Sequence, residues 1–220
     1  MKANSEMTEA QIQTYSQSRP TVFVVDDDAA MRDSLRWLLE SAQLNVQTFD
    51  SAEAFLTIAQ PDACGCLVLD VQMPGLSGPE LMDELKRRHV HLPILFLSGH
   101  GDIPTVVQAM KGGAVDFLQK PYDNAQLLER IGQALTLDAD SRDARRREFL
   151  RSQRLEGLTA REREILDQVV AGRSNKEVGR KLAISYKTVE AHRGRLMRKM
   201  GAASFAELLQ MMLGGRRETI

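Results

Sequence analysis

Short apolar segments alternate with amphipathic ones through the first two thirds of the chain. Five short runs combine β-branched and other apolar residues as buried strands do, at residues 21–25, 46–49, 66–69, 94–97 and 115–118. The segments between them repeat apolar residues every three to four positions, as Met31, Leu35 and Leu38 do, which predicts helices. This alternation predicts an α/β fold in which helices cover both faces of a five-stranded parallel sheet. We expect the doubly wound, flavodoxin-like strand order 2-1-3-4-5.

The last third of the chain has a helical pattern only. Four segments beyond Leu158 have the helical period, at residues 159–170, 174–182, 185–200 and 204–213. We therefore expect four parts in the chain: a disordered polar tail over 1–19, an α/β domain over 20–137, a charged segment over 138–157 and a smaller all-α domain over 158–220. The charged segment is dense in Arg and Asp, and the sequence leaves open whether it continues the preceding helix or forms a linker.

Composition favours a cytoplasmic protein without a membrane partner. No apolar run approaches the roughly 18 residues that cross a bilayer, and the polar start lacks the apolar stretch of a secretory signal. The two cysteines, Cys64 and Cys66, suit buried reduced thiols better than a disulfide framework.

The net charge of −1 hides a division between the two halves. Residues 20–137 hold 8 basic and 16 acidic side chains, whereas residues 158–220 hold 13 basic and 7 acidic ones. An acidic domain suits cations or basic partners, and a basic domain suits a polyanion, of which nucleic acid is the first candidate.

Acidic side chains follow directly after the first and third predicted strands. Asp26, Asp27 and Asp28 come after the first strand, and Asp70 comes after the third. In the expected order these strands are neighbours whose carboxyl ends flank one crevice, so the acids should meet there. Several carboxylates at one site repel one another unless a hard cation neutralises them, and Mg²⁺ suits oxygen ligands.

A lysine and a hydroxyl should reach the same edge of the sheet. Lys120 follows the fifth predicted strand, and Ser98 follows the fourth. An acid surrounded by a cation, a lysine and a hydroxyl has what phosphoryl transfer to a carboxylate requires, namely an in-line nucleophile and neutralised phosphoryl oxygens. The pattern predicts that Asp70 is the nucleophile.

A resemblance to the receiver domain of bacterial two-component response regulators covers about residues 20–137. It rests on these segments: VFVVDDD, LVLDVQMPGLSG, PILFLSGHG and FLQKP. The resemblance implies that a sensor histidine kinase phosphorylates Asp70 and that Lys120 contacts the phosphoryl oxygens. It also implies Mg²⁺ as the cofactor, with these ligands: Asp26, Asp27, Asp70 and the backbone carbonyl of Gln72.

The same resemblance assigns switch and tuning positions. Ser98 stands where Ser or Thr is usual, and Phe117 stands at an aromatic position that is often Tyr, keeping the bulk without the polar tip. Gln72 and His100 stand at the variable positions that control how water reaches the acyl phosphate. His100 is equally compatible with an ordinary polar loop residue.

These residues admit two other interpretations. Helix capping would account for Asp28, because Asp is favoured before helices, but hardly for Asp70 ahead of Val-Gln-Met-Pro. A zinc site would need these four side chains: Cys64, Cys66, His89 and His91. The two histidines lie in a separate connection, so buried thiols and surface histidines are the interpretation we prefer.

Within the basic domain, residues 174–182 and 185–200 have the pattern of a helix-turn-helix, in which Ser185 can cap the second helix. An apolar seam on this second helix has three members: Val189, Leu196 and Met200. The opposite face has four: Lys187, Glu190, Ala191 and Gly194. Small residues there permit close approach to base edges, although a basic helix can also merely pack on its neighbours and face solvent.

Residues 158 to about 209 closely resemble the LuxR-type DNA-binding domain, which implies double-stranded DNA as a partner. The candidates for DNA contact are Lys176, Lys181, Lys187, Thr188, Glu190, Ala191, Arg193, Gly194, Arg195 and Arg198. Two of them depart from the family pattern. Glu190 stands where Lys is frequent, and Gly194 lies inside a helix, where Gly costs roughly 1 kcal/mol relative to Ala. Glu190 would either accept a hydrogen bond from cytosine N4 or pair with Arg193.

Together the halves resemble a response regulator of the NarL/FixJ type, closest to the FixJ-like branch. The resemblance implies that phosphorylated protein forms a homodimer, binds promoter DNA and acts on RNA polymerase, with activation the commoner outcome. A Mg²⁺-dependent phosphatase is the enzymatic alternative, but such enzymes commonly need a second acid near the nucleophile, and position 72 is Gln. A receiver domain that accepts no phosphate and regulates DNA through protein contacts alone is a third interpretation. We expect a regulator rather than an enzyme.

Overall fold

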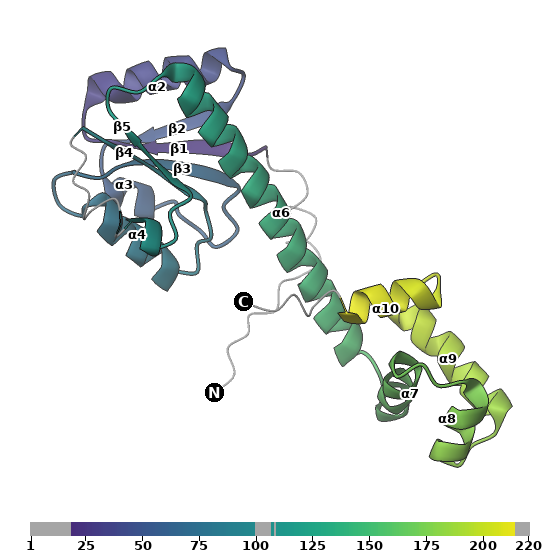
Figure 1. Ribbon diagram of the computed structural model, residues 1–220. Coiled ribbons are helices and arrows are strands. Elements are labelled where there is room, and N and C mark those ends of the chain that lie inside the picture. The colour runs from purple at the N-terminus through teal and green to yellow at the C-terminus, as the bar shows by residue number, and fades with distance from the viewer. Residues whose placement is uncertain (1–18, 100–106, 108, 214–220) are drawn as a thin grey trace. The chain divides into compact units, whose positions relative to one another are not determined.

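The computed structural model describes residues 19–99, 107 and 109–213 (Figure 1). The predicted tail up to residue 18 and His100 lie outside the described residues. The chain forms two compact units, Met1–Ser141 and Arg142–Ile220, and the boundary between them falls within one helix.

The first unit is built on a five-stranded sheet in which every pair is parallel. Its strands are β1 (Thr21–Val25), β2 (Asn45–Phe49), β3 (Gly65–Asp70), β4 (Ile94–Ser98) and β5 (Asp116–Gln119). Their order is β2-β1-β3-β4-β5, which confirms the predicted flavodoxin-like fold. β1 lies between β2 and β3, so that Thr21 is opposite both Asn45 and Gly65.

Helices cover both faces of this sheet (Figure 1). α2 (Ala29–Ser41) and α6 (Asn124–Glu156) pack on one face, whereas α3 (Ala52–Leu56) and α4 (Gly78–Arg87) pack on the other. Side chains of β1 alternate between the two layers, because successive residues of a strand point to opposite faces. Val24 packs in the α2/α6 layer, and Phe23 packs in the α3/α4 layer. The carboxyl ends of all five strands are thereby held along one edge of a rigid sheet.

The amino end of β3 is fastened to α6. Gly65 has a φ of +133°, and a Cβ there would lie 1.8 Å from the carbonyl oxygen of Thr21. Its N–H donates to the Asp138 carboxylate at 2.9 Å, and Asp138 is only 1% exposed. Only glycine fits at this position, where β3 closely approaches both β1 and α6. Residues 138–156 continue α6 as a helix, which is one of the two conformations that the sequence left open.

The second unit is helical beyond the end of α6. Its helices are α7 (Ala160–Val170), α8 (Asn175–Leu182), α9 (Tyr186–Met200) and α10 (Phe205–Leu213). Ser174 and Ser185 cap α8 and α9, and their hydroxyls accept from the N–H groups of Glu177 and Thr188. A Cβ at Gly179 would lie 2.8 Å from the Ile184 carbonyl oxygen, so glycine permits the tight α8–α9 turn. Across the described residues, no helix is both long and apolar enough to cross a membrane.

Candidate functional site

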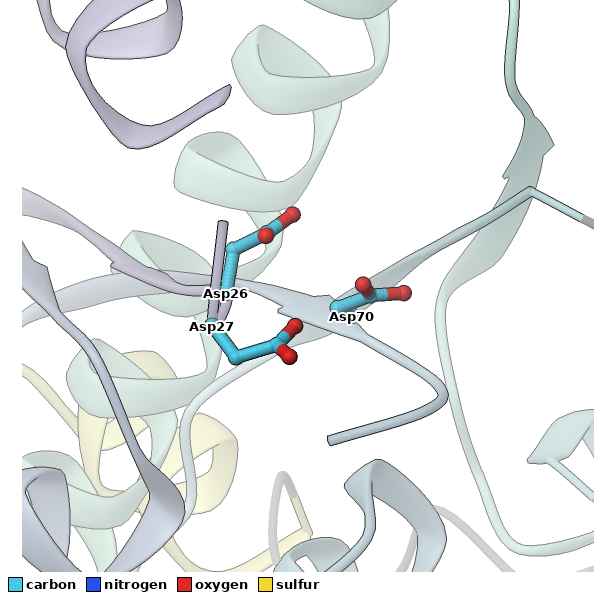
Figure 2. Close-up of side chains that lie close together, drawn as sticks. All are labelled: Asp26, Asp27 and Asp70. Carbon is cyan, nitrogen blue, oxygen red and sulfur yellow. The ribbon is translucent and has the colours of Figure 1, made fainter. Parts of the chain in front are cut away.

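Three aspartates meet at the carboxyl edge of the sheet. Asp26 and Asp27 follow β1, and Asp70 ends β3, the strand beside it. One carboxylate oxygen from each lies within 4.8 Å of the others (Figure 2). Asp26 is buried, Asp70 is half-buried and Asp27 is exposed, so the cluster opens toward solvent on one side. Three oxygen donors at this spacing form a set that a hard divalent cation can share.

Lys120 brings a positive charge to this cluster. It follows β5, and its Nζ lies 2.7 Å from Asp26 Oδ2 and 3.3 Å from Asp70 Oδ2. Its side chain is 17% exposed, so the ion pairs are partly shielded from water. The ammonium group therefore joins Asp26, which follows β1, to Asp70, which ends β3.

The surroundings of Asp70 disfavour the ionised form of its carboxylate, which added positive charge would stabilise. Burial raises the pKa of Asp70; the charge of Lys120 opposes this shift, the charge of Asp26 adds to it, and the pKa stays raised. Burial alone would lower the pKa of Lys120, but the hydrogen bonds and charges of Asp26 and Asp70 leave it raised. A divalent cation among the three carboxylates would favour their ionised forms.

The backbone around Asp26 is fixed by local contacts. Asp28 caps α2 by accepting from the N–H of Ala30 at 2.8 Å, the structural use that the sequence favoured for it. The Asp28 N–H donates to Asp26 Oδ1 at 2.9 Å. Arg32, which the sequence did not single out, donates to the Asp26 carbonyl at 2.8 Å. The sequence indicates this role through the position of Arg32, which lies in the first turn of the helix that follows the run of three aspartates.

The other predicted receiver residues lie at this edge, inside the sheet and in the loop after β3. Ser98 ends β4 and is 4% exposed, and its carbonyl accepts from the Lys120 N–H at 2.7 Å. Phe117 lies on β5 opposite Phe96 and packs half-buried against the α3/α4 layer. Gln72 is exposed in the loop after β3.

The zinc alternative finds no support among the described residues. The only group of three or more potential ligands there is the aspartate cluster. Cys64 and Cys66 are buried and not disulfide-bonded. Burial, with a contribution from the charge of Asp138, raises the pKa of the Cys66 thiol to about 12. A thiol must lose its proton to bind zinc, so this environment disfavours ligation.

The exposed side of α9 forms the second candidate site. The predicted apolar seam is buried in the core of the helical unit: Val189, Leu196 and Met200. Exposed residues on α8 and α9 include nine of the predicted DNA contacts: Lys176, Lys181, Lys187, Thr188, Glu190, Ala191, Gly194, Arg195 and Arg198. Arg193 is half-buried, and its Nη1 donates to Asn175 Oδ1 at 2.8 Å. The side of α9 away from the core is therefore basic and built partly of small residues.

The family of the chain follows from two sequence matches. Residues 22–132 match the response regulator receiver domain, and residues 156–212 match the bacterial regulatory proteins of the luxR family. The chain belongs to the response regulator family. It combines a receiver domain with a LuxR-type DNA-binding domain, and so it is a transcriptional regulator of a two-component system.

Relatives of this response regulator match over most of their length. Transcriptional regulatory protein TdiR of Thauera aromatica is 49% identical over 195 residues, which cover 89% of this chain and 86% of that protein. Transcriptional regulatory protein FixJ of Azorhizobium caulinodans is 46% identical, over 87% of this chain and 91% of that protein. These relatives are regulators rather than enzymes, which agrees with the expectation from the sequence.

Solved structures of response regulators are also similar to this chain. The response regulator StyR superposes with a TM-score of 0.82 at 44% identity, over 90% of this chain and 100% of that one. Full-length FixJ from B. japonicum superposes with a TM-score of 0.57 at 41% identity, over 92% of this chain and 100% of that one. The FixJ-like resemblance seen in the sequence is confirmed.

An ion pair between a buried carboxylate and an exposed lysine links two helices of the DNA-binding domain of this response regulator. Glu162, in the first turn of α7, is 3% exposed. Its Oε2 accepts from Lys199 Nζ of α9 at 2.7 Å and from the Thr159 N–H at 2.9 Å. These hydrogen bonds, that from Lys199 first, lower the pKa of Glu162 to about 2. The pair fixes the amino end of α7 against the carboxyl-terminal part of α9.

The Glu162–Lys199 pair should make the stability of this domain depend on pH. Because the pKa is about 2 in the folded protein against an ordinary value of 4.5, the stabilisation is complete above the ordinary value and is lost as pH falls toward 2. We expect Glu162→Gln to lower the melting temperature near neutral pH, by a difference that shrinks on acidification. Thermal unfolding from about pH 7 to about pH 3 measures this difference. Glu164→Gln, which removes a carboxylate from an exposed pair with Arg161, is the control and should change the melting temperature little. If the melting temperature of Glu162→Gln lies below that of the wild type by the same amount at every pH, this account is contradicted.

Proposed function

We propose that a sensor histidine kinase phosphorylates Asp70 of this regulator, and that the phosphorylated chain forms a homodimer that binds promoter DNA. Transcription would then be activated through RNA polymerase, in the cytoplasm. The observation that carries the proposal is the Lys120 ammonium within reach of both Asp26 and Asp70. The same chain supplies an exposed basic helix for DNA.

The chemical step needs a nucleophile and charge neutralisation. A carboxylate oxygen of Asp70 would attack the phosphorus of the kinase's phosphohistidine. The O–P bond would form as the N–P bond breaks, and the histidine nitrogen would keep the electron pair of that bond. Lys120 Nζ would neutralise phosphoryl oxygens, since it already lies 3.3 Å from Asp70 Oδ2.

Mg²⁺ fits the donors present, because carboxylate oxygens are the ligands it prefers. The residues proposed to hold it are Asp26, Asp27, Asp70 and the backbone carbonyl of Gln72. When bound, the ion supplies positive charge for the phosphoryl oxygens. Asp26 would be held in place for this role by the contacts of Arg32 and Asp28.

Transmission from Asp70 would use the residues on β4 and β5. We propose that the Ser98 hydroxyl turns toward the phosphoryl group and that Phe117 moves inward in response. The buried position of Ser98 and the half-buried packing of Phe117 support this assignment. Gln72 and His100 would tune how water reaches the acyl phosphate.

For the DNA-binding domain, we propose that α9 enters the major groove and that α8 contacts the backbone. The residues proposed for contact are Lys176, Lys181, Lys187, Thr188, Glu190, Ala191, Arg193, Gly194, Arg195 and Arg198. Their exposure supports this assignment for all but Arg193, which is half-buried. A homodimer would place two such DNA-binding domains on one promoter.

Incorporation of phosphate tests the chemical half of this proposal. The full chain is incubated with acetyl phosphate and Mg²⁺, and its intact mass is measured. We expect a single phosphoryl group per chain that is released in alkali, as an acyl phosphate is, and that is absent in Asp70→Asn and after chelation of Mg²⁺. Asp62→Asn, which removes an exposed carboxyl ahead of β3, is the matched control and should be labelled as the wild type is. Equal labelling of Asp70→Asn would overturn the assignment of the nucleophile.

A further inference from the structure

Glu190 is an acidic residue on the face of α9 that is otherwise basic or small. One helical turn away on the same face lie Lys187 and Gly194, and Ala191 is adjacent; all four residues are exposed. A Cβ added at Gly194 would meet no atom within 4 Å. The side chains around Glu190 therefore include small ones that leave open space. Its carboxylate can come close to a duplex that α9 approaches.

Arg193 is the cation best spaced to pair with Glu190 along the helix, but its guanidinium is already held elsewhere. Its Nη1 donates to Asn175 Oδ1 at the start of α8. The guanidinium carbon lies 5.2 Å from the centroid of the Phe205 ring on α10. The ion pairs found among the described residues do not join Glu190 to Arg193. Of the two roles that the sequence left open for Glu190, pairing with Arg193 is the one that this geometry disfavours.

A carboxylate for which no ion pair is found among the described residues has few favourable contacts on a helix that faces DNA. Phosphates repel it, because duplex DNA carries about one negative charge per 1.7 Å of its axis. A carboxylate only accepts hydrogen bonds, so it needs a donor on a base edge. The donors in the major groove are cytosine N4 and adenine N6. Adenine N6 is flanked by the acceptor N7, which repels a carboxylate, whereas cytosine N4 has no acceptor beside it on its own base.

We infer that Glu190 selects cytosine at one position of the DNA sequence that this regulator binds. The inference rests on the proposed DNA-binding function. It goes beyond that function by naming the residue that discriminates and the base that it requires. The carboxylate accepts a hydrogen bond from the N4 amino group in the major groove, and the neighbouring small residues allow the approach.

A selection from a randomised duplex pool tests the inference. The full chain, treated with acetyl phosphate and Mg²⁺, is compared with Glu190→Gln and Glu190→Ala. Glu156→Gln is the matched control, because it removes the same charge from an exposed position outside α9, at the end of α6. Bound DNA is sequenced, and the preference at each position is calculated from the enrichment of the four bases.

We expect the wild type and Glu156→Gln to prefer cytosine at one shared position by about 5- to 150-fold. Glu190→Ala should lose that preference, and Glu190→Gln should shift it toward adenine, whose N6 and N7 suit an amide. Preferences at the other positions should persist, which distinguishes base reading from a general loss of fold. If Glu190→Gln and the wild type prefer the same bases at every position, the inference is overturned. If no protein in the set enriches any sequence, the proposed DNA-binding function itself fails, and the inference fails with it.

Discussion

Replacing Gly65 with alanine is expected to destabilise the receiver domain by about 3 kcal/mol or more. The residue has a φ of +133°, and the added Cβ would lie 1.8 Å from the Thr21 carbonyl oxygen. Because that oxygen belongs to backbone, the clash can be relieved only by moving β3 away from β1. Such a movement would also weaken the hydrogen bond from the Gly65 N–H to Asp138, where α6 is fastened to the sheet.

Chemical denaturation followed by circular dichroism measures this effect on the full chain. Gly132→Ala is the matched control, because Gly132 lies on α6 where an added Cβ would meet no atom within 4 Å. The control should be neutral or more stable by up to about 1 kcal/mol, since alanine favours the helix. If Gly65→Ala unfolds at the same denaturant concentration as the wild type, the close approach of Gly65 on β3 to Thr21 on β1 described above is incorrect.

Replacing Lys120 with methionine is expected to slow phosphorylation of the receiver by about 10²-fold or more. The ammonium group lies 2.7 Å from Asp26 Oδ2 and 3.3 Å from Asp70 Oδ2, where it can neutralise a phosphoryl group on Asp70. Methionine keeps much of the side-chain length but removes the charge, so the cluster of three carboxylates loses its only described ammonium partner. Phosphoryl transfer to Asp70 would then proceed without this stabilisation of its developing charge.

The rate of phosphoryl incorporation from acetyl phosphate, at saturating Mg²⁺, measures the effect. Lys111→Met, at an exposed position of the same domain, is the control and should react as fast as the wild type. Lys120→Arg restores the charge with a different shape, and a partial recovery of rate would separate the role of charge from that of geometry. A Lys120→Met protein that is folded and reacts at the wild-type rate would contradict the contact proposed for Lys120.

Much of the fold and the acidic site could be predicted because short-range chemistry determines them. The apolar run predicted at residues 66–69 is the core of β3, and the acid that ends it is Asp70. Adjacent strands in the expected order bring Asp26 and Asp70 together without any knowledge of side-chain packing. Helix α9 likewise begins after the serine that caps it, because capping and amphipathic period are local properties.

Contacts between elements far apart in the chain could not be predicted in this way. The hydrogen bond between Gly65 and Asp138 joins residues 73 positions apart, and neither residue has a sequence pattern that points to the other. Arg193 shows the same limit, because helical spacing places it near the side of α9 that is proposed to face DNA. Packing of α8 and α10 instead provides Asn175 and Phe205 as partners for its guanidinium. Such pairings depend on the angles at which helices pack, which the period of one helix does not determine.

The central claim, that phosphate on Asp70 controls DNA binding by this regulator, is tested most directly by one binding measurement. Purified full-length wild type and Asp70→Asn are bound to a pool of genomic DNA fragments in the presence of Mg²⁺, with and without acetyl phosphate. We predict that only the phosphorylated wild type binds a selected set of fragments tightly. Selective binding that is the same with and without the phosphodonor, and the same for Asp70→Asn, would contradict the claim and leave a regulator that works without phosphate.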